Sequence, residues 1–228
     1  MLKWVLVLSA VLLQSACSNR TEQAQEILKS HLGKKPYLEF QNVEAFPGGA
    51  VCGEYRTNDP MPGGSRFHRF VVLGETAKGR PSKQDWAIFC SEDAATALRA
   101  NLGIGPVGNE ENQLLQIRDE LKHLQTALEQ YQEDNHFLPT TKQGLAALVS
   151  APTTPPVPTK FRPEGYLKSL PADPWGRQYI YELERLSGRV RQKFQLYTLG
   201  ADGASGGEGS NADVSLEHLK YLDYLIPQ

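Results

Sequence analysis

One apolar stripe in the second half of this 228-residue chain restricts its fold more than any other feature. Between positions 110 and 133, large apolar side chains recur at alternating spacings of 3 and 4 residues: Leu114, Ile117, Leu121, Leu124, Leu128 and Tyr131. This spacing gathers them on one face of a helix. We expect a long amphipathic helix whose apolar face packs on a sheet. A dimerising coiled coil is the alternative, but it needs about three or four full heptads, more than this stripe has.

The amino terminus has the pattern of a secretory leader. Lys3 is followed by residues 4–13, which are apolar except for one serine, and then by the small residues Ser15 and Ala16. A membrane-spanning helix needs about 20 apolar residues, so this run is too short to span a bilayer. We predict a signal peptide over residues 1–16.

Cys17 follows those two small residues, a pattern that resembles the lipobox of bacterial lipoproteins. In that family the cysteine is acylated and becomes the first mature residue. Gln14 stands where the lipobox prefers leucine, and where cleavage by ordinary signal peptidase after Ala16 would require a small residue. The resemblance implies lipidation of Cys17 and a lipid-anchored protein of the bacterial cell envelope. Ser18 after the cysteine further implies an outer-membrane anchor that faces the periplasm.

The chain contains three cysteines. With Cys17 assigned to lipid, Cys52 and Cys90 form an even pair in an exported, oxidising compartment where disulfides persist. We predict a bridge between them, with two buried free thiols as the alternative. A bridge closing a loop of about 39 residues would stabilise the fold by about 4 kcal/mol.

Two regions separate the leader from the long helix. Residues 17–33 are polar with apolar positions at helical spacing, which predicts a tether or short helix after the lipidated cysteine. Residues 34–105 predict a small β-rich, disulfide-bonded domain with an antiparallel sheet, because short runs of β-branched and aromatic residues alternate with Pro/Gly clusters. These runs are residues 37–40, 50–55, 67–73 and 86–90.

Both cysteines of the predicted bridge lie in such runs, so it would join the second strand to the last. Ser91 is expected to cap a short helix over residues 92–101. Glycines from Gly103 to Gly108 mark the end of this domain.

Behind the long helix, the sequence predicts a mixture of short elements. They are a helical segment at 141–149, a proline-rich connection at 152–163, a strand or extended stretch at 166–170, and strands at 179–184 and 193–199 joined by a turn around Ser187 and Gly188. We expect Trp175 to be buried against the helix stripe. The apolar residues of 215–228 predict a terminal helix that docks either on this domain or on a partner. The fold class is therefore α+β.

From Leu114 onward the chain resembles type II secretion system protein G, the major pseudopilin. The matching motifs cover about 100 residues in the family's order: Leu128-x-x-Tyr131-x-x-Asp134-Asn135, Leu138-Pro139-Thr140-Thr141-x-Gln143-Gly144-Leu145, Gly165-Tyr166-Leu167, Leu170-Pro171-x-Asp173-Pro174-Trp175-Gly176 and Leu199-Gly200-Ala201-Asp202-Gly203 through to Ala212-Asp213. The resemblance implies a pseudopilin-like head over residues 109–228, with the long helix packed on a small antiparallel sheet.

The resemblance also implies a Ca²⁺ site in the loop 199–213. Matching positions assign side-chain ligation to Asp202 and Asp213, a backbone carbonyl to Leu199, and further contributions to Ser210 and Asn211. The composition of the loop supports the same site, because Asp202, Glu208 and Asp213 are three carboxylates with no Lys or Arg between positions 193 and 220. Such a loop repels itself unless a cation neutralises it. A flexible acidic loop without an ion is the alternative.

The chain departs from that family before the head. Pseudopilins begin with a short basic leader and an apolar helix that packs into the fibre spine, whereas here a lipobox and the disulfide-bonded domain precede the head. We therefore expect a lipid-anchored accessory or interaction component of a type II secretion-like system, in contact with secretion-system or other envelope proteins. The alternative is a stand-alone periplasmic binding lipoprotein unrelated to secretion.

Other function classes have little support in the sequence. A formal net charge of −2 supplies no field that would attract nucleic acid. The five histidines have no metal-binding spacing, and no nucleophile-elbow, phosphate-loop or dinucleotide motif occurs. We expect a non-enzyme, although an acid-base pair of carboxylates brought together by the fold stays open as a hydrolase hypothesis.

Overall fold

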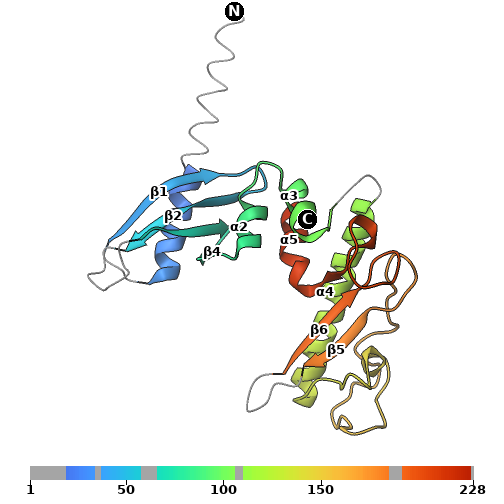
Figure 1. Cartoon of the computed structure of the whole chain (residues 1–228). Coiled ribbons are helices and arrows are strands. Elements are labelled where there is room, and N and C mark those ends of the chain that lie inside the picture. Colours follow the sequence, from blue (N-terminus) through green and yellow to red (C-terminus); the bar gives the residue numbers. More distant parts are fainter. Residues whose placement is uncertain (1–18, 34–36, 58–65, 106–109, 185–191, 227–228) are drawn as a thin grey trace, which may run out of the picture. The chain divides into compact units, whose positions relative to one another are not determined.

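The structure, a computed structural model, describes residues 19–33, 37–57, 66–105, 110–184 and 192–226 (Figure 1). Contacts divide the chain into two compact units, Met1–Asn101 and Leu102–Gln228. The predicted signal peptide, Cys17 and the predicted turn around Ser187 lie outside the described residues. Within those residues, no helix is both long and apolar enough to span a membrane.

The first unit is a four-stranded antiparallel sheet with a helix over residues 19–32 packed on one face. The strands follow one another in sheet order: β1 (Leu38–Ala45), β2 (Ala50–Thr57), β3 (His68–Leu73) and β4 (Thr76–Gly79). Ala24 and Leu28 from the helix join Val51, Phe70 and Val72 in one apolar core. The predicted antiparallel sheet is confirmed, but its fourth strand was not predicted.

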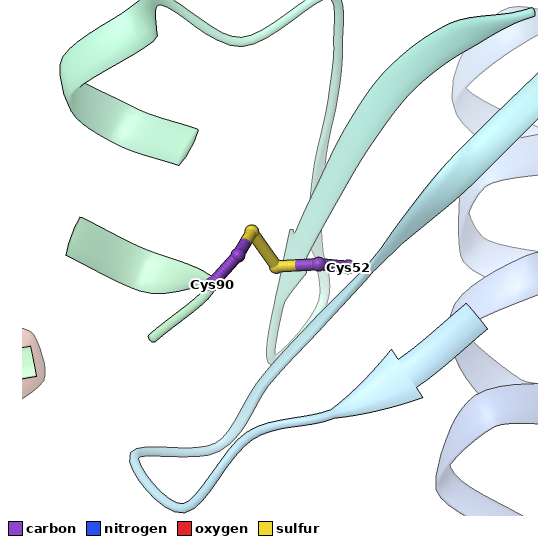
Figure 2. The surroundings of a disulfide bond; sticks show 2 residues. All are labelled: Cys52 and Cys90. Atoms are coloured by element: carbon purple, nitrogen blue, oxygen red, sulfur yellow. A yellow bond between two sulfur atoms is a disulfide. The ribbon is translucent and has the colours of Figure 1, made fainter. Parts of the chain in front are cut away.

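Side chains alternate between the two sheet faces, so Cys52 lies opposite to the helix-facing Val51. On the face of Cys52 the chain forms helix α2 (Lys83–Phe89), which is followed directly by Cys90. The Cys52–Cys90 disulfide has a Cα–Cα distance of 5.9 Å and joins β2 to the end of α2 (Figure 2). The predicted bridge is confirmed.

The prediction of a strand at 86–90 is wrong. Ser82 accepts a hydrogen bond from the Asp85 N–H (3.0 Å) and starts a helix whose buried residues, Asp85, Ile88 and Phe89, have helical spacing. Helix α3 (Ala94–Leu102) follows. Its first turn is capped by Asp93, which accepts from the Thr96 N–H at 2.9 Å, and not by the predicted Ser91.

The second unit is built around α4 (Glu110–Asn135), which confirms the long helix. All six residues of its apolar stripe are at most 6% exposed. The helix contacts strand β6 (Lys193–Thr198), the 3-10 helix η1 (Leu145–Leu148) and helix α5 (Leu219–Leu225). The sheet is antiparallel in the order β5 (Ile180–Glu184), β6, β7 (Val214–Ser215). The predicted α+β class is confirmed.

Three local predictions for this unit differ from the structure. Residues 166–170 form no strand, because the N–H groups of Tyr166 and Leu167 both donate to the Leu148 carbonyl (2.7 and 3.1 Å). The helical segment predicted at 141–149 is shorter, because residues 141–144 form a turn and only Leu145–Leu148 are helical, in η1. Trp175 is half-buried, with the Arg177 guanidinium 5.9 Å from its ring centre.

The terminal helix docks on its own chain. Arg118 of α4 is buried and donates from Nη1 to the Ile226 carbonyl at 2.5 Å. Lys122 pairs with Asp223 at 2.5 Å. Of the two docking modes left open by the sequence, the structure therefore has α5 packed on α4.

Candidate metal-binding loop

Residues 199–213 connect β6 to β7, and the two ends of this loop lie side by side. The Ala201 N–H donates to the Ser210 carbonyl at 2.7 Å. Gly200 and Gly207 both have positive φ (64° and 89°), and a Cβ on either one would lie 2.6 or 2.5 Å from the Asn211 carbonyl oxygen. Only glycine allows this approach, so the Asn211 backbone packs closely against both Gly200, at the start of the loop, and Gly207.

The two predicted carboxylate ligands have different surroundings. Asp213 accepts from the Gly206 N–H through Oδ2 (2.9 Å), while its Oδ1 is buried with no hydrogen-bond partner among the described residues. Asp202 is exposed, and its Oδ1 accepts from the Ala204 N–H at 3.0 Å. A buried carboxylate oxygen without a donor is rare in folded proteins and points to a missing cation or water.

The other predicted ligands, Leu199, Ser210 and Asn211, carry carbonyl, hydroxyl or amide oxygens and lie in the same loop. Ser210 and Asn211 lie in the 3-10 helix η2 (Gly209–Asn211), and Leu199 directly follows β6. The described residues contain no group of three or more His, Cys, Asp or Glu side chains that could hold a metal. An ion here would thus need backbone, hydroxyl and amide oxygens beside the two carboxylates. Calcium accepts such mixed sets of oxygen ligands, so the residues present fit this ion.

A buried carboxylate positions the start of the loop. Asp173 is 4% exposed and accepts from the N–H groups of Trp175 (3.1 Å) and Arg177 (2.8 Å) and from the Thr198 hydroxyl (2.6 Å). Because Thr198 is the last residue of β6, this network fixes the point where the loop leaves the sheet.

Arg177 is the residue beside the loop that the sequence did not reveal. Its guanidinium donates to the Gly200 carbonyl, and a Cβ on Gly203 would lie 3.4 Å from it. The loop itself has no basic residue, but the fold brings this cation to it from a position 23 residues upstream. The i, i+4 spacing of Asp173 and Arg177 was the one available signal, and it does not identify the loop as their partner.

A histidine lies in the chain just after the loop and β7. His218 accepts from the Ser215 N–H through Nδ1 at 3.2 Å, so the ring is neutral in this arrangement. Burial lowers the pKa of His218, and Lys220 lowers it further, while Glu217 and Asp213 act in the opposite direction.

Comparison with known proteins places these features in a family context. Residues 108–217 match the family model described as type II secretion system (T2SS), protein G. The type II secretion system core protein G of Pseudomonas aeruginosa is 44% identical over 97 residues, which cover 42% of this chain and 66% of the relative. The Vibrio cholerae protein of that name is 50% identical over 91 residues, which cover 40% of this chain and 59% of the relative. The Klebsiella pneumoniae protein is 40% identical over 109 residues, which cover 47% of this chain and 73% of the relative.

The major pseudopilin from the type 2 secretion system of enterohaemorrhagic Escherichia coli is a solved structure with 34% identity. The match covers 47% of this chain and 88% of that chain, with a TM-score of 0.40. The chain spans 66% and 59% of the lengths of the Pseudomonas and Vibrio relatives. Residues 1–107 lie outside the region matched by the family model.

Proposed function

Since this chain belongs, through residues 108–217, to the type II secretion system protein G family, we propose that it is an accessory component of a type II secretion-like system. Its role is that of a non-enzymatic interaction protein in the cell envelope. The partners are other secretion-system proteins, which its pseudopilin-like head contacts.

The observation that carries this proposal is the kind of structure found upstream of the family region. In the pseudopilin family an apolar helix that enters the fibre spine precedes the head. Here a separately packed, disulfide-bonded unit of helix and sheet precedes it. A folded unit with polar surfaces does not pack into an apolar spine, so we assign the head an accessory role instead of a fibre-building one.

We further propose that the chain is anchored by lipid. Residues 1–16 act as a signal peptide and Cys17 carries the acyl groups, on an outer membrane facing the periplasm. Two features support this export route: Ser15 and Ala16 precede the cysteine, and the Cys52–Cys90 disulfide suits an oxidising compartment.

Calcium is the proposed structural ion of the head. Its ligands are the side chains of Asp202 and Asp213, the Leu199 carbonyl, and oxygens of Ser210 and Asn211. The ion supplies charge neutralisation and a cross-link between the two ends of the loop. The buried, unpartnered Oδ1 of Asp213 supports this assignment.

Gene deletion in the native bacterium tests the secretory role. We expect lower levels of type II substrates in the medium, restored by the wild-type gene. Photo-crosslinkers on the exposed face of α4, at Thr126 or Glu129, should capture another secretion-system protein. Unchanged secretion together with no such adduct would instead favour a stand-alone binding lipoprotein.

Metabolic labelling with a palmitate analogue tests the anchor independently. The wild-type chain should be labelled and fractionate with the outer membrane, whereas the Cys17→Ser variant should be unlabelled. Equal labelling of both chains would refute lipidation at Cys17.

A further inference from the structure

A short segment upstream of the family region packs on the candidate metal-binding loop. The Gly209 N–H donates to the Gly103 carbonyl at 2.8 Å. A Cβ on Gly103, which has a φ of 71°, would lie 3.0 Å from the Gly207 carbonyl oxygen and 3.4 Å from Glu208 Cγ. Ile104 is 0% exposed and Gly105 is buried. Residues 103–105, here called the docking segment, therefore form part of the second unit although the family match begins at 108.

The loop segment 207–211 contacts the docking segment and the predicted ion ligands at once. Gly207 faces Gly103 and also packs against the Asn211 backbone. The same Asn211 backbone packs against Gly200, and the Ser210 carbonyl accepts from Ala201. Residues 207–211 thus lie between the docking segment and the start of the loop. Any ligand that orders them also orders the surface on which the docking segment lies.

We propose that calcium binding to the loop and docking of residues 103–105 are coupled, so that the ion stabilises the packing of this segment on the loop, at the point where the chain enters the head. This inference rests on the proposed calcium site. Coupling is reciprocal: if calcium favours docking, docking raises the affinity for calcium by the same factor.

Hydrogen exchange on the mature full chain, with and without calcium, tests the coupling directly. Calorimetry first establishes binding of the ion to the same sample. Calcium should slow amide exchange of residues 103–105 and of Gly209 about 5-fold or more, the lower end of typical coupling factors. Bound calcium with unchanged exchange at these amides would overturn the inference and leave the calcium site standing. Absence of binding would overturn both.

A glycine pair provides a matched mutational test. Gly103→Ala adds a Cβ against Gly207, whereas Gly74→Ala has a similar positive φ (54°) but no atom within 4 Å of the new Cβ. We expect Gly103→Ala to weaken calcium binding about 5-fold or more, and Gly74→Ala to change it less than about 2-fold. Equal affinities for both variants would contradict the coupling. If Gly103→Ala does not fold, the exchange experiment on the unmodified chain decides alone.

Discussion

At the scale of single residues, the carboxylate of Asp173 connects three donors at the entrance to the loop. Its replacement by alanine would leave the 1%-exposed Thr198 hydroxyl and two N–H groups without an acceptor. An unsatisfied buried donor costs about 1–3 kcal/mol, so Asp173→Ala should lower the free energy of unfolding of the second unit by about 2–3 kcal/mol. Urea unfolding measures this change.

A double-mutant cycle shows how much of that cost belongs to the Thr198 bond. Thr198→Val removes the hydroxyl at nearly constant shape, so Asp173→Ala should cost less in that background. Equal costs in both backgrounds would mean that the bond contributes nothing and that the two N–H groups carry the effect.

We expect His218 to make the stability of the head depend on pH. Its pKa is lowered from 6.5 in the folded state, mainly by burial, so the unfolded chain binds more protons near and below that pH. The stabilising contribution is therefore present above about pH 6.5 and is lost as pH falls through the lower pKa of the folded state. The protonated ring also cannot accept from Ser215.

His218→Gln provides the control for this pH dependence, since glutamine can accept the Ser215 N–H but does not titrate. In the presence of chelator, the melting temperature of the wild-type head should fall more between pH 7 and pH 5 than that of the variant. His68, whose pKa is also lowered by burial, is unchanged in both chains and cancels in the comparison. Identical pH profiles would show that His218 does not titrate with folding.

At the scale of elements, the disulfide ties a central strand to a helix end across one face of the first sheet. It joins residues 38 apart, between β2 and the end of α2. Closing a loop of this size restricts the unfolded chain, so Cys52→Ala with Cys90→Ala should lower the stability of the first unit by about 4 kcal/mol. Chemical unfolding followed by the fluorescence of Trp86 measures it. A loss confined to the second unit would contradict the assignment.

The elements that sequence reasoning predicted well are those specified by long periodic patterns. The apolar stripe from Leu114 to Tyr131 predicts a single structure, a helix with one buried face, and the structure has that helix. Residues 86–90 were misassigned because a short aromatic run is equally compatible with a strand or a helix. The Ser82 cap and the spacing of Asp85, Ile88 and Phe89 distinguish the two.

Only part of the candidate site could be predicted from the sequence, for a different physical reason. Asp202 and Asp213 stand in one acidic, glycine-rich segment, so composition and resemblance identify them together. Arg177 and Gly103 reach the same loop through hydrogen bonds with Gly200 and Gly209, which lie 23 and 106 positions further along the chain (200 − 177 and 209 − 103). Such contacts depend on the tertiary fold, and no local pattern around either residue indicates them.

At the scale of the whole molecule, each of the two units has its own core and, among the residues that the structure describes, one tryptophan. Trp86 lies in the first unit and Trp175 in the second, so Trp175→Phe and Trp86→Phe chains report on the first and second unit, respectively. Small units with independent cores are expected to unfold in separate transitions. Each unit also depends on its own stabilising device, the disulfide in the first and the proposed calcium ion in the second.

Reductant and chelator should therefore act on different transitions of the same chain. Calcium at about 100 times its dissociation constant stabilises a folded state that binds it by about 2.7 kcal/mol, so adding it should raise only the transition reported by Trp175. Reductant should lower only the transition reported by Trp86. In an Asp202→Ala, Asp213→Ala chain the calcium shift should disappear while the reductant shift persists. A calcium shift that survives this double substitution would place the ion outside the loop.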